Sequence, residues 1–234
     1  MAPISGEFPP RPRVQPAAPP GYVAYNGAGQ ANDRSASGLG KATIALFWLV
    51  TAMSGLLALA LFARKSKWDD AVGGSASLSD LRNADDFVRL AAGLQFAVQI
   101  AAVILVALWA RLIASNARSH GAWDVKPGLA TGGWFIPIGW FWVGFTQLRR
   151  ADAALGGRSQ NLSRWQGAFV LVGVFGVISR GIDNSTDLGA SATDVSDTFQ
   201  RQGVIGLVAA VVFALAAFFA TRSIKEIGNV RAEL

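Results

Sequence analysis

Charged residues divide the chain beyond Lys41 into five apolar stretches that contain no charged residue. A helix needs about 20 consecutive apolar residues to cross a hydrocarbon core of about 30 Å. Buried helices of soluble proteins rarely continue that long without a charge. The pattern therefore predicts an all-α fold, an integral membrane helical bundle. The stretches are residues 42–63, 90–110, 127–148, 165–179 and 202–221.

The fourth stretch is the shortest, at about 22 Å by helical rise. Arg164 and Arg180 flank it, and long cationic side chains extend toward water while their stems stay in an apolar layer. We therefore expect this stretch to cross the membrane as well.

The third stretch differs from the others because glycine and proline interrupt it. Glycine frees the backbone, and proline removes an amide donor. This density, together with interfacial tryptophans, is typical of a broken, re-entrant or surface-lying segment. We expect four spanning helices plus one broken re-entrant or interfacial helix; the alternative is five spans. The broken-helix motif consists of Pro127, Gly132, Gly133, Trp134 and Pro137.

The distribution of basic residues favours the non-spanning third segment. If that segment does not span, the N-terminal tail, residues 111–164 and the C-terminus share one side and hold 14 of the 21 Lys and Arg residues. If it spans, the tail side holds only nine of them. Because basic loops stay in the cytoplasm, we expect a multi-pass protein of the cell membrane with both termini cytoplasmic.

Composition divides the chain further. Residues 1–40 hold seven of the nine prolines and both tyrosines, so we expect a disordered Pro-rich tail. Within it Pro19, Pro20 and Tyr22 form a PPxY-like sequence, which serves either as a docking motif or only as part of a tether. Residues 41–228 form the predicted transmembrane helical domain, and residues 229–234 a short C-terminal tail.

The chain lacks cysteine, and His120 is its only histidine. This composition excludes disulfides, thiolate chemistry and multi-histidine metal sites. We therefore expect no metal, no cofactor and no enzyme active site. The formal charge of +6 is explained by basic residues that flank apolar spans, and no basic helix face indicates nucleic-acid binding.

Polar and small residues within the stretches indicate helix packing. Gln95 and Gln99 lie one turn apart, where they would form either an interhelical hydrogen bond or a polar seam. Small residues recur at one-turn spacing and predict close packing within the bundle or, alternatively, with a second copy or a partner. These helix-packing residues are Gly93, Ala97 and Ala101, then Gly206, Ala210 and Ala214.

Three further features concern the connections between the stretches. Ser77 and Asp80 have the spacing of a capping box, which predicts a helix start. Residues 183–199 carry four aspartates and predict a solvated loop. A basic belt is expected to attract anionic lipid headgroups, although topogenic charge explains it equally well. The belt consists of Arg149, Arg150, Arg158 and Arg164.

The stretch from Trp109 to Ile182 resembles the actinobacterial multi-pass membrane proteins of domain of unknown function 4328. The resemblance rests on Arg111, Asn116, the sequence PGLATGGWFIPI from Pro127 and the helix-opening Trp165. Family members usually follow this motif with an asparagine and an Arg-Pro pair, where this chain has Trp140, Val143 and Gly144. The resemblance implies a membrane protein with a Pro-rich tail, and it implies no reaction.

These features together favour a non-enzymatic scaffold or accessory subunit. It would bind protein partners through the tail and the helix faces, contact membrane lipids and form a homo-oligomer if a small-residue stripe pairs with a second copy. The alternative is a small channel or facilitator, in which the broken third segment with Gln95 and Gln99 lines a path for a neutral solute.

Overall fold

The computed structural model describes residues 29–136, 139, 142–157, 160–183 and 191–230; side chains are described for residues 37–136, 139, 142–157, 160–176 and 191–228. All regular secondary structure in these ranges is helical, so the all-α prediction is confirmed. The helices are α1 (Gly29–Val72), α2 (Leu78–Ser119), α3 (Pro127–Gly132), α4 (Val143–Ala154), α5 (Asn161–Asp183) and α6 (Ala192–Val230).

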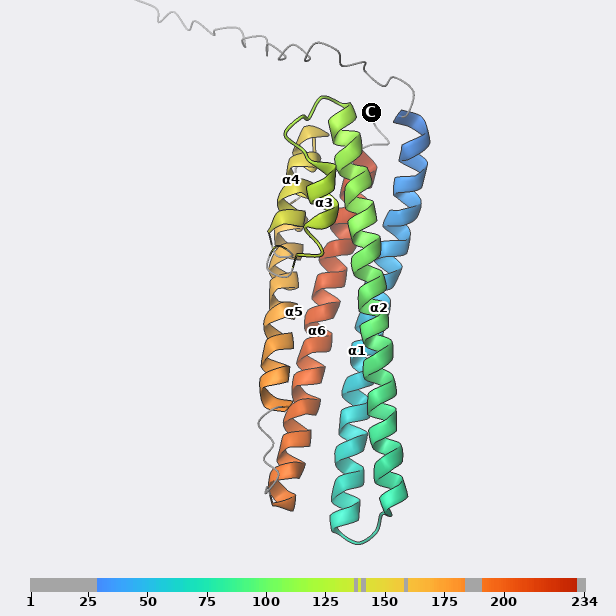
Figure 1. Ribbon diagram of the computed structural model, residues 1–234, viewed down its shortest axis with the longest axis vertical. Helices are drawn as coiled ribbons and strands as arrows, with labels where there is room; N and C mark the ends of the chain where they lie inside the picture. Colours follow the sequence, from blue (N-terminus) through green and yellow to red (C-terminus); the bar gives the residue numbers. More distant parts are fainter. Residues whose placement is uncertain (1–28, 137–138, 140–141, 158–159, 184–190, 231–234) are drawn as a thin grey trace, which may run out of the picture.

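The long helices lie side by side along one axis (Figure 1). Helix α1 packs on α2 and α6, and α6 packs on α5. The start of α1, the end of α2, the end of α6 and both short helices lie at the same end of the bundle, which we call the hairpin end (Figure 1). The turn between α1 and α2 lies at the opposite end, the turn end.

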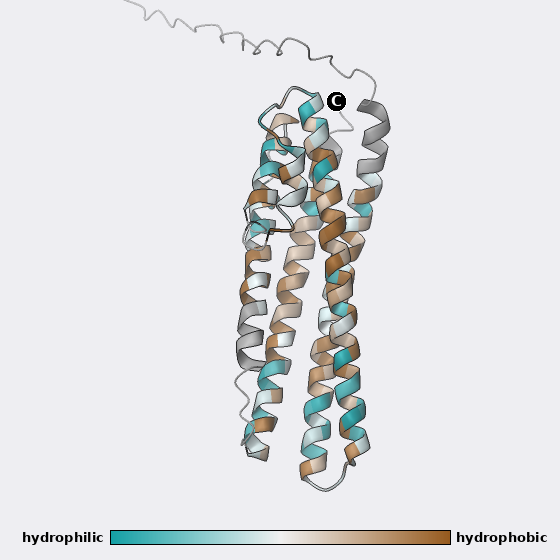
Figure 2. Ribbon diagram, viewed as in Figure 1, coloured by the Kyte–Doolittle hydropathy of each residue, from teal (hydrophilic) through white to brown (hydrophobic). Residues whose placement is uncertain are grey.

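Among the residues whose side chains are described, three helices are long and apolar enough to cross a membrane: Ser37–Val72, Leu78–Ser119 and Ala192–Gly228. Hydrophobic residues fill their central parts, and polar residues are more frequent toward both ends (Figure 2). Many large apolar side chains in the central parts of these helices point outward, among them Leu59, Phe96 and Leu207. Such exposure suits a lipid environment, because exposed apolar side chains are unfavourable in water but are covered by the hydrocarbon chains of a bilayer.

The described part of the chain thus shows three helices of this kind, whereas the sequence predicted four or five spans. The third stretch is not one helix, because α3 ends at Gly132 and α4 begins at Val143. The two short helices pack on each other and on α2, and together we call them the α3–α4 hairpin. Helix α5 contains the fourth stretch and has 23 residues; its side chains are described only to residue 176, so its crossing stays a prediction.

The buried core lies toward the hairpin end. Its largest fully buried side chains include Trp109, Trp134, Phe145 and Trp165. They come from α2, the α3–α4 hairpin and α5. The hairpin end is therefore a packed unit in its own right.

Two predicted boundaries are wrong. Helix α1 begins at Gly29, within the stretch expected to be disordered up to residue 40. A Cβ atom on Gly40 would lie 3.0 Å from Ile224 Cγ2 and 3.3 Å from Trp109 Nε1, so the helix already packs on α2 and α6 at residue 40. Residues 1–28, with the PPxY-like sequence, and residues 231–234 lie outside the described residues.

The second wrong boundary concerns the expected loop over residues 183–199, because α6 already begins at Ala192. The hydroxyl of Ser191 accepts a hydrogen bond from the backbone N–H of Asp194, and the Asp194 carboxylate accepts one from the backbone N–H of Ser191. This reciprocal pair caps the first turn of the helix.

Candidate functional site at the hairpin end

The α3–α4 hairpin begins with two local features. Pro127 occupies the first turn of α3, where its missing amide hydrogen breaks no helical hydrogen bond. The side-chain oxygen of Gln147 on α4 accepts a hydrogen bond of 2.8 Å from the backbone N–H of Lys126. Gln147 is buried, so this bond joins the base of α3 to α4.

Glycine lets the two short helices approach closely. A Cβ atom on Gly133 would lie 2.8 Å from the backbone nitrogen of Gly144, and one on Gly144 would lie 2.7 Å from Cε2 of Trp134. A Cβ atom on Gly132 would meet nothing within 4 Å. Of the motif glycines, Gly133 is thus the one needed for packing. Gly144, outside the predicted motif, is needed equally, and Pro137 lies outside the described residues.

Buried aromatic rings connect the hairpin to the long helices. The ring of Phe145 lies 5.0 Å from that of Trp134 and 5.0 Å from that of Trp165, which opens the apolar stretch of α5. Trp134 stacks on Trp165 at 6.1 Å, and Phe47 of α1 meets Trp165 edge-on at 5.7 Å. We call Phe47, Trp134, Phe145 and Trp165 the aromatic cluster. It fixes the position of the hairpin relative to α1 and α5.

Large apolar side chains beside the buried Trp134 point outward at the tip of the hairpin. Phe135 is 53% exposed, Ile136 50% and Trp142 57%. A protein in water rarely gathers such side chains at one point without a binding partner. The sequence motif predicted the break in the helix but did not separate the buried Trp134 from these three exposed residues, which we call the hairpin tip.

Of the predicted basic belt, Arg149, Arg150 and Arg164 are exposed, and Arg158 lies outside the described residues. Arg149 and Arg150 lie on α4, and Arg164 lies on α5 directly before the aromatic Trp165. His120 is exposed just after the last residue of α2. Among the side chains that the structure describes, no three of His, Asp and Glu come together as metal ligands would.

The predicted polar residues of α2 have different surroundings. Gln95 Nε2 donates a hydrogen bond of 2.8 Å to Ser54 Oγ on α1, and Ser54 Oγ donates to the carbonyl oxygen of Val50. Gln95 therefore forms the interhelical bond, one of its two predicted uses. Gln99 is half-buried.

The two small-residue stripes also differ. A Cβ atom on Gly206 would lie 3.3 Å from Ala58 Cβ of α1, whereas one on Gly93 would meet nothing within 4 Å. Ala97 is exposed like Gly93, while Ala101, Ala210 and Ala214 are half-buried. Gly93 and Ala97 are thus exposed in the bundle, and their alternative use, packing on a second copy or a partner, stays a prediction.

The turn end contains polar contacts that join three helices. Arg64 of α1 forms an ion pair of 2.6 Å with Asp85 of α2, and its guanidinium lies 4.1 Å from the ring centroid of Phe199 on α6. The indole N–H of Trp68 donates to the carbonyl oxygen of Ala192, and its ring meets Phe199 edge-on. These contacts could not be predicted from local sequence patterns, because their partners lie far apart along the chain.

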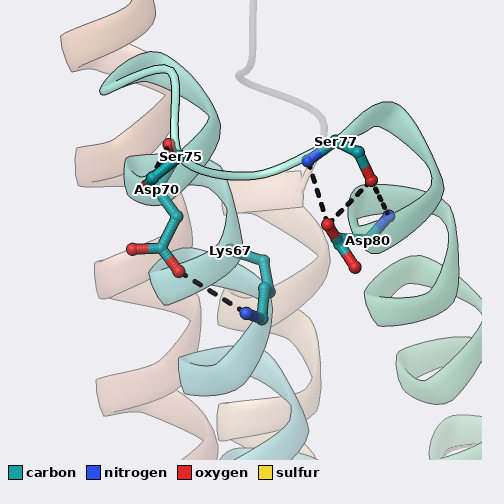
Figure 3. Close-up of polar contacts among 5 residues, drawn as sticks. All are labelled: Lys67, Asp70, Ser75, Ser77 and Asp80. Carbon is teal, nitrogen blue, oxygen red and sulfur yellow. Dashed lines mark hydrogen bonds and ion pairs between the residues drawn. The ribbon is translucent and has the colours of Figure 1, made fainter.

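The carboxylates at this end are held by hydrogen bonds. The backbone N–H of Ser77 donates to the Asp80 carboxylate at 2.9 Å, and the backbone N–H of Asp80 donates to the Ser77 hydroxyl at 3.3 Å, which confirms the predicted capping box (Figure 3). The Ser77 hydroxyl also donates to the same carboxylate at 2.7 Å. These bonds to the carboxylate lower the pKa of Asp80 below its ordinary value of 3.8. Hydrogen bonds from Lys65 and then Ser196 lower the pKa of Asp69 in the same way. Both carboxylates lie outside the charge-free stretches.

No family model, curated protein or solved structure matches this chain. The resemblance to domain of unknown function 4328 therefore stays a prediction.

Proposed function

We propose that the chain is a multi-pass protein of the cell membrane in which α1, α2, α5 and α6 span the bilayer. The α3–α4 hairpin does not cross the bilayer, and it lies on the cytoplasmic side together with both termini of the chain. Three observations support this topology. The start of α1, the end of α6 and the hairpin share one end of the bundle (Figure 1). Three of the described helices are long and apolar enough to cross, and the shared side collects 14 of 21 basic residues.

Single-cysteine variants test the topology, because the natural chain contains no cysteine. Ser119→Cys and Ser163→Cys flank the hairpin, and Ser79→Cys lies at the turn end; all three positions are exposed. In intact cells a membrane-impermeant maleimide is expected to label only the cysteine at position 79. Labelling at 119 and 163 is expected after permeabilisation. If positions 119 and 163 are labelled from opposite sides, the third stretch spans and the topology is wrong.

Within this topology we propose a non-enzymatic scaffold or accessory subunit that binds protein partners and lipid at the hairpin end. The observation that carries the proposal is the aromatic cluster, which holds α1, α5 and the hairpin in one packed unit. Phe145 contacts both tryptophans of the cluster. A rigid unit beside the membrane presents its surface in a fixed shape, which lowers the entropic cost of binding a partner.

Photo-crosslinking in living cells tests the scaffold. A photoreactive amino acid at Ser119 or Lys225, both exposed at the hairpin end, is expected to give a discrete protein adduct. The same amino acid at Ser79 serves as the control. The proposal is abandoned if neither hairpin-end position gives an adduct that the control lacks. It is also abandoned if the purified protein in lipid turns over a substrate and one polar substitution removes that activity.

The alternative, a channel for a neutral solute, has weaker support. The amide of Gln95 that would line the path is bound to Ser54 of the neighbouring helix. Solute flux in liposomes that disappears with Gln95→Leu would favour the channel over the scaffold.

A further inference from the structure

We propose that the hairpin tip inserts into the membrane leaflet at the hairpin end and that the cations next to it bind anionic phospholipid headgroups. The proposal rests on the topology above. It goes beyond a general affinity for lipid by naming the inserted residues, their depth and the headgroup charge.

The depth of the tip follows from the aromatic cluster. Trp165 is the first residue of the charge-free stretch of α5, and Phe47 lies about 8 Å inside the charge-free stretch of α1 by helical rise. Trp134 stacks on Trp165, which in turn contacts Phe47. The residue after Trp134, Phe135, therefore lies near the level at which the charge-free stretches begin.

A second contact marks the same level. Trp48 of α1 is exposed, and its indole N–H donates to Oγ1 of Thr221, the last residue of the charge-free stretch of α6. Exposed tryptophans with a satisfied N–H are typical of the boundary between hydrocarbon and headgroups. The hairpin tip and this tryptophan thus both belong to the interface at the hairpin end.

The cations lie at the distance that an interfacial segment requires. Arg149 lies seven positions after Trp142, the N-cap residue of α4, which corresponds to about 10 Å along the helix. Interfacial helices bury their apolar side about 5–10 Å into the boundary between headgroups and acyl chains. With Trp142 at that depth, Arg149 and Arg150 reach the phosphate level.

The charge of the segment that carries the tip favours anionic headgroups over zwitterionic ones. Between Arg111 and Trp165, the described residues include six exposed cations and one exposed carboxylate, that of Asp124. The second carboxylate in this range, Asp152, is buried. The exposed cations are Arg111, Arg118, Lys126, Arg149, Arg150 and Arg164.

Lipid quenching at the tip tests both parts of the proposal. The full chain with Ile136→Cys, labelled with the environment-sensitive dye NBD, is reconstituted into nanodiscs of phosphatidylcholine and phosphatidylglycerol. Spin-labelled lipids of either headgroup serve as quenchers. We expect emission typical of an apolar environment and stronger quenching by the labelled phosphatidylglycerol. A dye on Ser119→Cys reports a position outside the membrane.

Charge removal tests the headgroup preference. Each of Arg149→Gln and Arg150→Gln is expected to lower the preference for phosphatidylglycerol, by up to about fivefold per cation and no further than parity. Each of Arg82→Gln and Arg89→Gln removes one positive charge at the turn end in the same way and is expected to leave the signal at position 136 unchanged. Thermal unfolding verifies that all variants are folded.

Any other result of these experiments overturns one part of the proposal, either the insertion of the tip or the binding of anionic headgroups. Water-like emission at position 136 without quenching means that the tip does not insert, while unchanged sidedness of positions 119 and 79 leaves the topology standing. Quenching without headgroup preference removes the anionic site. Loss of the preference on adding inorganic phosphate, but not sodium chloride of equal ionic strength, indicates a site for free phosphate instead of lipid. A photoreactive amino acid at position 136 that crosslinks to a protein in living cells would show that a docked partner, and not the membrane, covers the tip.

Discussion

The close approach of Gly144 and Trp134 gives a sharp prediction about stability. In Gly144→Ala the new methyl group would lie 2.7 Å from Cε2 and 2.8 Å from Nε1 of the buried indole. Indole rings cannot bend, so Trp134 or α4 must shift. Overpacking of this kind costs about 1–3 kcal/mol, and the better helix propensity of alanine returns at most about 1 kcal/mol. We expect a net loss of about 1–2 kcal/mol.

Thermal unfolding in detergent, followed by circular dichroism, measures this loss. By the scaling for chains of this size, the midpoint is expected to fall by about 2–8 °C. Gly132→Ala is the matched control, because its methyl group meets nothing within 4 Å. It is expected to be neutral or to stabilise by up to about 1 kcal/mol.

A double variant separates the contact from a general effect on α4. Trp134→Phe replaces the indole, whose Cε2 and Nε1 lie nearest the new methyl group, with a smaller ring, so adding Gly144→Ala is expected to cost less there than in the natural chain. Contacting residues show coupling of about 0.5–3 kcal/mol. If Gly144→Ala melts no lower than the natural chain, or if its cost is the same with phenylalanine at 134, the packing described for the hairpin is refuted.

Three further predictions concern the long helices. Gln95→Leu and Ser54→Ala are expected to show a coupling of about 0.6–2 kcal/mol in a double-mutant cycle of detergent unfolding, because they share one interhelical hydrogen bond; additive effects would contradict it. Gly203→Ala is expected to destabilise the α1–α6 contact, since its Cβ would lie 2.9 Å from the ring of Phe62, and Phe62→Leu is expected to relieve that cost in the same assay. The folded-state pKa of Asp80 is lowered, so its contribution to stability is present above about pH 4 and is lost as the pH falls through the folded-state pKa. Asp80→Asn is therefore expected to reduce the acid-induced drop in melting temperature. An unchanged pH profile would show that the capping box contributes no pH-dependent stability.

The charge-free stretches predicted where helices run, but not where they end. The stretch of α1 ends at Ala63, yet the helix continues to Val72. Trp68 and Arg64 stabilise this continuation by contacting α6 near Phe199. Local composition cannot reveal such support, because it depends on residues more than a hundred positions away.

Spacing alone likewise failed to show which small residues pack. Gly93 and Gly206 stand in the same one-turn pattern, and only Gly206 lies against a neighbouring helix. Periodicity defines a helix face, whereas the arrangement of the other helices decides whether that face is buried. In the third stretch the glycines correctly predicted a break, but the pairing of Gly133 with Gly144 depends on how the two halves fold together.

The α3–α4 hairpin has a consequence for how the chain is inserted during synthesis. It returns the chain to the end of the bundle that it left, so in the proposed topology it decides the direction in which α5 and α6 are threaded. If residues 127–148 formed one continuous helix that crossed, both following helices would have to reverse, and the C-terminus would emerge on the other face of the membrane. A few glycine and proline positions would thus control the orientation of every residue that follows them.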